Sequence, residues 1–287
     1  MLGETLSVIT SFLWATSTVL VAKALKDIDP ISVNALKTFF SSISMLPIAF
    51  LMGEIQNIYN LDFYSLVLVI LAAIIGFGIG DTIFFKSINL IGVSRSYTIA
   101  YIYPLITIVL ATMFLGEPFL LRYLLGAVII FFGVIMVSVN NKSKEMKEGL
   151  KGQLTAFITA IFWSIALILL TLGLKNFSVI LANAIRFPFL LFFLLLASLL
   201  RRRTNKKSFL SKRNLIFLAS SGILGMTIGG IIFLYSIQLI GVSRATPLSS
   251  TSPIWASLMS GIFLKEKVTW RAVTSSLMVV IGIYFLT

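Results

Sequence analysis

Three ionisable side chains interrupt long apolar runs of this chain, and their types decide what chemistry is available there. They are Lys37, Asp81 and Arg186. A charge placed among apolar side chains is costly unless it is paired or solvated, so such residues are rare without a role. A carboxylate in that setting can exchange a proton or bind a cation, and a basic group can bind a carboxylate or a phosphate.

Asp81 follows the run GFGIG at positions 76–80, whose three glycines permit close helix approach or local unwinding. We expect Asp81 to be a coupling site for a proton or another cation, or the partner of an amine on a solute. Two other interpretations stay open, namely an internal salt bridge to Lys37 and a position near the end of a helix.

The two basic residues each have an asparagine three positions earlier, on the same helix face. These asparagines are Asn34, before Lys37, and Asn183, before Arg186. We expect all four side chains to contribute to a site for the carboxylate or phosphate of a solute. The alternative is that the two long basic side chains extend back to the nearest polar interface.

Further candidates are aromatic or hydroxyl-bearing residues within apolar runs, where each polar atom needs a partner. The candidates for solute binding are Trp14, Tyr97, Tyr101, Trp163, Ser249, Ser250 and Thr251. Pro104 and Pro253 each free a backbone carbonyl one turn earlier, so we expect them to act as helix hinges. Packing between helices is the alternative interpretation for these residues.

The composition indicates which elements must hold these residues. Hydrophobic residues make up 58% of the 287 positions and charged residues 11%, against about 45–50% and about 25% in soluble domains. A lipid bilayer must therefore supply part of the solvent, and the expected fold class is an all-α integral membrane protein.

Several classes of function are disfavoured by what the sequence lacks. Cys and His are absent, which removes thiolate and imidazole ligands and the commonest general base, so we expect no enzyme, cofactor or metal. The net charge of +13 comes from Lys and Arg gathered in short loops, which argues against a nucleic-acid partner.

Ten stretches are long and apolar enough to cross a bilayer as helices. Their approximate limits are 5–25, 32–52, 65–85, 96–116, 121–140, 152–174, 180–200, 214–236, 245–264 and 269–286. Lys and Arg crowd into the loops on one side, which we expect to be cytoplasmic. Both termini are then extracytoplasmic in a multi-pass protein of the cell membrane.

The chain repeats itself at an offset of 149 residues. The segment SINLIGVSR at 87–95 returns as SIQLIGVSR at 236–244. The same offset pairs Trp14 with Trp163. Chance does not keep rare residue types in register over such a length, so the pattern indicates a gene duplication.

We predict two tandem repeats, 1–140 and 152–287, joined by a basic cytoplasmic linker at 141–151. Five spans is an odd number, so the second repeat enters the membrane from the opposite face. Glu117 and Glu266 each precede a helix, and we expect them to cap free N–H groups. Paired halves of opposite topology are typical of secondary transporters.

A wider resemblance follows from the order of these residues. In each half it is carried by a tryptophan, a basic residue, a GVSR turn, a proline and a glutamate, namely Trp14, Lys37, 92–95, Pro104 and Glu117, then Trp163, Arg186, 241–244, Pro253 and Glu266. Over its whole length the chain resembles the EamA-like ten-helix members of the drug/metabolite transporter superfamily. It departs from them at Lys37, where members usually carry arginine, and at Lys265, which replaces a glycine.

The resemblance implies a basket-shaped bundle with a central cavity and alternating access for amino acids, sugars, nucleotide sugars, organic acids or drugs. We therefore expect a secondary carrier of a small polar metabolite, amino-acid-like or another organic anion or zwitterion, that acts as an exporter or exchanger. The expected partners are the solute, membrane lipid and a coupled proton or counter-solute. A multidrug or lipophilic-cation exporter and a non-transport sensor or assembly protein stay open as alternatives.

Overall fold

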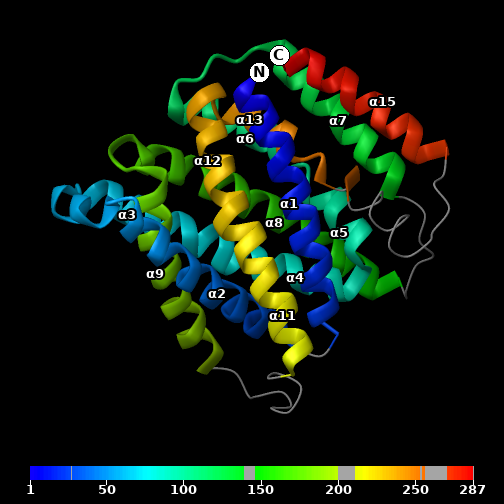
Figure 1. Ribbon diagram of the computed structural model, residues 1–287. Coiled ribbons are helices and arrows are strands. Elements are labelled where there is room, and N and C mark those ends of the chain that lie inside the picture. Colours follow the sequence, from blue (N-terminus) through cyan, green and yellow to red (C-terminus); the bar gives the residue numbers. More distant parts are fainter. Residues whose placement is uncertain (27, 139–145, 200–210, 253, 256–269, 287) are drawn as a thin grey trace.

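The computed structural model describes residues 1–26, 28–138, 146–199, 211–252, 254–255 and 270–286. Within these ranges every regular element is helical and none is a strand. The helices cross one another at an angle in one bundle, and the N- and C-terminal ends lie at the same end of it (Figure 1).

The helices of the two halves follow the same order. In the first half they are α1 Leu2–Ala24, α2 Pro30–Leu51, η1 Glu54–Asn60, α3 Phe63–Ala73, η2 Ile74–Gly80, α4 Asp81–Ile91, α5 Val93–Ala100, α6 Tyr103–Leu115 and α7 Leu121–Ser138. In the second half they are α8 Met146–Gly173, η3 Leu174–Asn176, α9 Val179–Leu199, α11 Lys212–Ser221, η4 Gly222–Ile228, α12 Gly229–Ile240, α13 Val242–Ser249 and α15 Trp270–Leu286. Helices α2 and α5 start 149 residues before α9 and α13, so the internal repeat of the sequence is also a repeat of helix boundaries.

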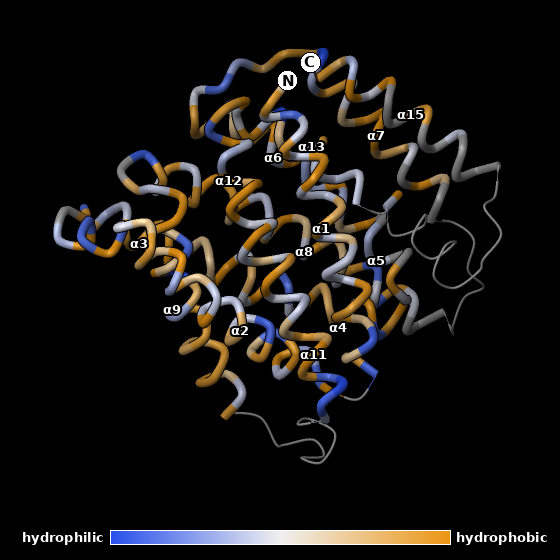
Figure 2. Tube along the Cα trace, in the orientation of Figure 1, coloured by the Kyte–Doolittle hydropathy of each residue, from blue (hydrophilic) through white to orange (hydrophobic). Residues whose placement is uncertain are grey.

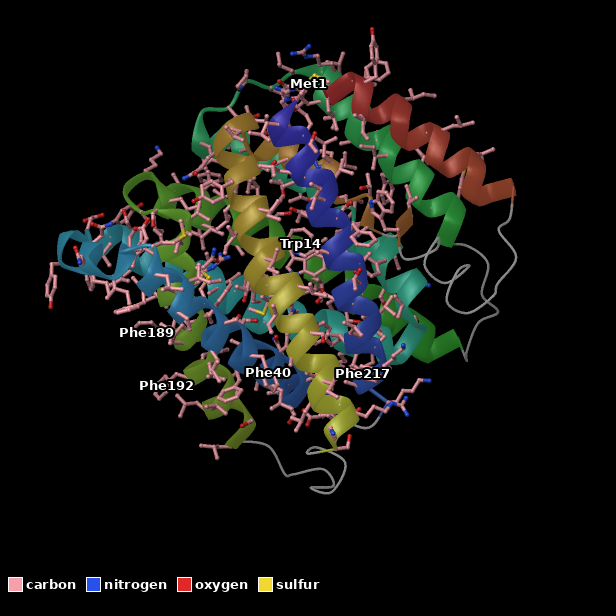
Figure 3. The ribbon with its side chains drawn as sticks, viewed as in Figure 1. Met1, Trp14, Phe40, Phe189, Phe192 and Phe217 are labelled. Atoms are coloured by element: carbon pink, nitrogen blue, oxygen red, sulfur yellow. The ribbon has the colours of Figure 1, made fainter. Side chains whose placement is uncertain are left out.

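Six continuous helical stretches among the described residues are long and apolar enough to span a membrane. They are Leu2–Ala24, Pro30–Leu51, Phe63–Ile91, Gly149–Gly173, Val179–Leu199 and Lys212–Ile240. Apolar residues run along nearly all of the bundle, as the hydropathy colouring shows (Figure 2). Phe189 and Phe192 of α9 are 49% and 63% exposed and project outward from the bundle (Figure 3). Such a surface needs lipid around it, which makes the chain a multi-pass membrane protein.

One expected span and one expected loop differ from the structure. The stretch 96–116 is two helices, α5 and α6, because the chain turns at Tyr101 and Ile102. The segment 87–95, expected as a loop, is largely helical, and Gly92 alone separates α4 from α5. Gly92 has φ +81°, a left-handed conformation that an L side chain adopts only with strain. Half of the expected span 245–264 lies outside the described residues.

Two π-helical segments, η2 and η4, interrupt the third span of each half. The wider turns of a π-helix leave backbone groups poorly paired, and such turns often mark functional sites. Asn34 on α2 donates from Nδ2 to the carbonyl oxygen of Phe77 at 2.6 Å and to Thr82 Oγ1 at 3.0 Å. The Trp14 indole donates to the carbonyl oxygen of Gly225 at 3.1 Å. Neighbouring helices thus satisfy the carbonyls that the unusual turns expose.

Each half packs its first helix against the third span of the other half. Helix α1 lies against α11, η4 and α12, and α8 lies against α3, η2 and α4. Hydroxyl pairs join α1 to its partner, with Ser7 Oγ 2.6 Å from Ser236 Oγ and Ser17 Oγ 2.7 Å from Ser221 Oγ. Small side chains allow this close approach, and their hydroxyl groups bond to each other because lipid offers no hydrogen-bond partner.

Glu117 caps a helix, but not the one that follows it in sequence. Its two carboxylate oxygens accept from the backbone N–H groups of Val242 and Ser243 at 2.8 and 3.0 Å. These groups begin α13, in the other half of the chain. The expected capping role is therefore a contact between halves, which spacing along the sequence alone does not reveal. Glu266 lies outside the described residues.

Gly126 on α7 provides a test of this packing. A Cβ atom there would lie 2.8 Å from the carbonyl oxygen of Gly282 on α15, closer than real contacts allow. We expect Gly126→Ala to lower the midpoint of thermal unfolding in detergent, by about 1–3 kcal/mol of stability, because neither backbone can yield freely.

Gly149→Ala is the matched control, since a Cβ atom at Gly149 meets nothing within 4 Å. This substitution should leave stability unchanged or raise it by up to about 1 kcal/mol through helix propensity. Equal effects of the two substitutions would contradict the close contact between α7 and α15.

Candidate functional site

A partly open central cavity of about 130 Å³ lies between the halves. Its lining comes from both halves, on α1, α2, α3, η2, α4, α5 and α6 of the first and on α8, α9, η4 and α12 of the second. Most of the wall is apolar or aromatic, and the charged lining residues are Lys37, Asp81 and Arg186.

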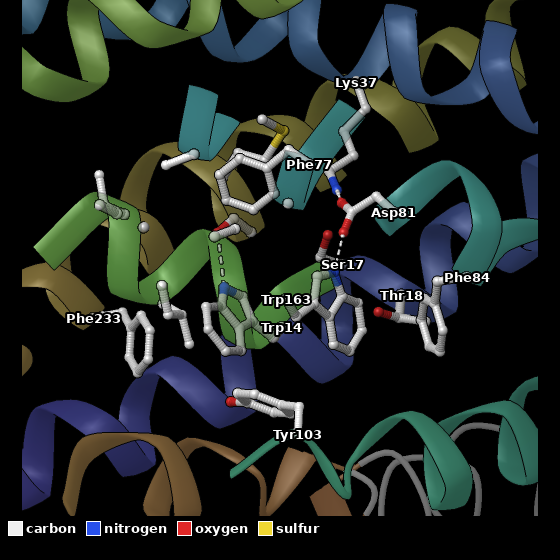
Figure 4. A pocket seen from close by; sticks show the side chains of 18 of the residues that line it. Trp14, Ser17, Thr18, Lys37, Phe77, Asp81, Phe84, Tyr103, Trp163 and Phe233 are labelled. Carbon is white, nitrogen blue, oxygen red and sulfur yellow. Dashed lines mark hydrogen bonds and ion pairs between the residues drawn. The ribbon is translucent and has the colours of Figure 1, made fainter. Parts of the chain in front are cut away.

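Asp81 is held by two partners at the start of α4, immediately after η2. Lys37 Nζ lies 2.8 Å from one carboxylate oxygen, and the Trp163 indole N–H donates to the other at 3.0 Å (Figure 4). Lys37 and Asp81 are each only 6% exposed. The salt bridge, one interpretation that the sequence left open, is therefore present, and through Trp163 it ties the first half to α8.

Arg186 is the most buried of the three charged residues, with 2% of its surface exposed. Its Nε donates to Asn183 Oδ1 at 2.9 Å, and its guanidinium carbon lies 5.2 Å from the ring centroids of Phe77 and of Phe187. Cation–π contacts of this kind partly replace water around the charge. Among the described residues no carboxylate forms an ion pair with Arg186, so its charge is not neutralised within that part of the protein.

The two tryptophans occupy equivalent places in the two halves. A Cβ atom on Gly80 would lie 3.0 Å from the Trp163 ring, and one on Gly229 would lie 3.2 Å from the Trp14 ring nitrogen. Each indole thus rests against a glycine of the opposite half. Only these glycines leave room for the rings to reach the cavity wall.

One wall of the cavity is an aromatic cluster. The Trp163 centroid lies 5.0 Å from that of Phe84 and 5.7 Å from that of Tyr103, and the tilted rings of Tyr97 and Tyr101 have centroids 4.7 Å apart. The Tyr97 hydroxyl donates to Thr18 Oγ1. Aromatic rings at these separations stabilise one another, so the cluster forms one packed wall.

Seven residues proposed from the sequence come together at this cavity, namely Trp14, Lys37, Asp81, Tyr97, Tyr101, Trp163 and Arg186. Five others lie outside its lining, namely Asn34, Asn183, Ser249, Ser250 and Thr251. Asn34 supports η2 and Asn183 orients Arg186, so both act through a neighbour. The three hydroxyl residues bond to backbone carbonyls three or four positions earlier, as Ser and Thr in helices often do.

The structure describes one of the two proposed hinge prolines. Pro104 lies in the first turn of α6, directly after the turn at Tyr101 and Ile102, and is buried. A proline in the first turn costs no hydrogen bond, because that N–H has no partner inside the helix. Pro253 lies outside the described residues.

The cavity also contains residues that the sequence did not single out as a site. Phe77, Phe84 and Phe233 line it, and an apolar ring within an apolar run carries no distinguishing signal. Ser17 and Thr18 also line it, on the turn of α1 that follows Trp14. Their spacing of three and four residues from that tryptophan was a usable signal for a shared helix face.

Comparisons with known proteins agree with this architecture. The model of the EamA-like transporter family matches residues 1–139 and 150–287. An uncharacterized transporter of Archaeoglobus fulgidus is 25% identical over 286 residues, covering 100% of this chain and 98% of that protein. The uncharacterized transporter YoaV of Bacillus subtilis is 20% identical over 279 residues, covering 96% and 94% of the two chains.

Two further similarities concern part of the chain and its fold. Protein LicB of Haemophilus influenzae is 35% identical over 128 residues, which is 43% of this chain and 42% of that protein. A protein of known crystal structure superposes with a TM-score of 0.78 at 15% identity, over 99% of this chain and 96% of the other, and so shares its fold. The chain is a multi-pass membrane transporter and belongs to the EamA-like transporter family, within the drug/metabolite transporter superfamily.

Proposed function

We propose that this protein is a secondary carrier for a small polar metabolite with an anionic group, either an organic anion or a zwitterion. The observation that carries the proposal is Arg186, a buried guanidinium on the cavity wall without an acidic partner in the described part of the chain. A buried charge of this kind needs an opposite charge, and a solute carboxylate or phosphate supplies one with bidentate geometry.

We further propose that transport proceeds by alternating access between two inverted five-helix repeats, 1–140 and 152–287, with ten membrane crossings in all. The repeat of helix boundaries at an offset of 149 supports this, as does the reciprocal packing of α1 and α8. If the repeats exchange conformations, the cavity opens to opposite sides in turn. The excess of Lys and Arg in alternate loops favours extracytoplasmic termini, a cell-membrane location and a cytoplasmic linker at 141–151.

In this mechanism Asp81 is the coupling residue. Its carboxylate balances Lys37 while deprotonated, and a proton on Asp81 would release Lys37 to face the cavity. The cavity then gains positive charge when it takes up a proton, which favours an anionic solute in the same state. An exporter or an exchanger can both use this linkage.

The aromatic wall favours a second candidate, an exporter of lipophilic cations. Tyr97, Tyr101, Tyr103, Phe84 and Trp163 form one contiguous cluster of rings. Aromatic faces bind quaternary ammonium groups and other cations. The net positive charge of the nearby lining weighs against this candidate, because it repels a second cation.

The ion pair generates a prediction about stability. Asp81→Asn leaves the Lys37 charge buried without its partner, and we expect a loss of about 3–5 kcal/mol, read as a lower midpoint of thermal unfolding. The double variant Lys37→Met/Asp81→Asn removes both charges at nearly constant volume and should recover most of that loss. Additive losses in the double variant would contradict the pairing.

Flux through liposomes tests the proposed function. The purified protein is reconstituted and given radiolabelled amino acids, organic acids, nucleotides, sugars and lipophilic cations. We expect carboxylate-bearing solutes to move, and Arg186→Ala to reduce their flux about tenfold or more, since a charge-assisted hydrogen bond contributes about 1.5–3 kcal/mol. The double variant Lys37→Met/Asp81→Asn should retain flux but lose its dependence on a proton gradient.

Arg122→Ala is the control for these measurements, because Arg122 is an exposed arginine of α7 outside the cavity. Its flux should equal that of the wild type. If lipophilic cations alone move, and Arg186→Ala transports them as the wild type does, the anion carrier is rejected in favour of the second candidate. Solute binding without flux in any condition would instead indicate a sensor.

A further inference from the structure

The two halves differ at one position that matters for charge. At the offset of 149, Lys37 corresponds to Arg186, and Asp81 corresponds to Gly230. The first half therefore contains both members of an ion pair, with Lys37 Nζ and Asp81 Oδ2 2.8 Å apart. The second half contains the basic member alone.

Gly230 lies where the missing carboxylate would be. A Cβ atom built on it would be 3.9 Å from Arg186 Nη2 and 3.9 Å from Asn183 Oδ1. Both distances are ordinary van der Waals contacts, so the position has room for a side chain directed at the guanidinium. Gly230 also lines the cavity, as Arg186 does.

The other buried glycines of this span have a steric reason to be glycine, and Gly230 has none. A Cβ atom on Gly222 would collide with the carbonyl oxygen of Lys37, and one on Gly225 with the side chain of Ser17. One on Gly229 would lie 3.0 Å from the carbonyl oxygen of Leu224. Gly230 sits within α12 and is not among the described glycines with positive φ. Close packing and turn geometry both fail to explain the absence of a side chain there.

Arg186 can bind the carboxylate that a glycine at position 230 does not supply. A guanidinium has five N–H donors in a planar fork. Only Nε has a hydrogen-bond partner among the described residues, so the Nη donors are available on the cavity wall. The fork matches a carboxylate, which is the group that Asp81 presents to Lys37.

We propose that the carboxylate of the solute occupies, beside Gly230, the place that the Asp81 carboxylate occupies beside Lys37. This inference rests on the proposed carrier function and gives the solute class more narrowly. Lys37, Asp81 and Arg186 leave one uncompensated positive charge on the wall, so the solute is a monocarboxylate. Trp14, Phe77 and Phe233 line the same cavity. The solute is therefore either a monocarboxylate whose remainder is apolar or aromatic, or a compact zwitterion.

The substitution Gly230→Asp tests this by supplying the missing carboxylate from the chain. We expect it to pair with Arg186, raise the unfolding midpoint of the ligand-free protein, and weaken monocarboxylate binding at least tenfold. Gly230→Asn is the matched control, because it has nearly the same volume and no charge. It should bind within threefold of the wild type and show no rise in the unfolding midpoint.

Binding is measured on the full chain in detergent by thermal shift and calorimetry, with acetate, benzoate, glycine and phenylalanine as probes. The proposal is overturned if no probe binds the wild type, or if Gly230→Asp and Gly230→Asn weaken binding equally. Should Gly230→Asp fail to fold, Arg186→Gln decides the question, since undiminished binding in that variant also overturns the proposal.

The same variants separate this inference from the carrier function. If the wild type transports a solute in liposomes and Gly230→Asp transports it equally well, the carrier stands and the carboxylate position is wrong. If monocarboxylates bind the wild type, fail to bind Gly230→Asp and never cross the membrane, the site stands and the carrier function is wrong.

Discussion

The contact between Asp81, Lys37 and Trp163 is the interaction on which the centre of this protein depends. It places a buried ion pair at the boundary between the two halves and uses both carboxylate oxygens. For Trp163 to reach Asp81, its ring must lie against Gly80, at the end of the π-helical turn η2. That turn is supported in its place by Asn34. The geometry of the cavity therefore follows from satisfying one carboxylate away from water.

The same constraint explains why small residues recur at the contact between halves. A polar group within the bilayer must find its partner inside the protein, and partners can meet only where backbones approach closely. Gly225 approaches Ser17, and Ser17 in turn bonds to Ser221. The Trp14 indole completes the arrangement by binding the carbonyl oxygen of Gly225. The bundle is thus held by packing and by short polar contacts, since burial of apolar surface provides no net drive within lipid.

Sequence reasoning found the helical membrane fold and much of the cavity because charges and tryptophans are conspicuous inside apolar runs. It placed Trp14, Lys37, Asp81, Trp163 and Arg186 in one site, and these residues do line the cavity. The sequence did not predict the π-helical turns, since a glycine-rich apolar run is compatible with several helix types. Ser249, Ser250 and Thr251 lie outside the cavity lining and bond to carbonyls of their own helix. Ser249 also bonds to the Tyr103 hydroxyl and Thr251 to Ser11, contacts that spacing along the sequence cannot reveal. Glu117 could not be matched to α13 without knowing that the halves meet there.

The two halves share helix boundaries but differ in their buried charges. In the first half the Lys37–Asp81 ion pair is complete. In the second half Arg186 carries a desolvation penalty that Asn183 and two phenylalanine rings reduce within the described part of the chain. If a solute anion binds Arg186 as we propose, it removes that penalty in whichever conformation encloses Arg186 most completely. Because a ligand stabilises the state it contacts best, the penalty on Arg186 would then link solute binding to closure of the cavity.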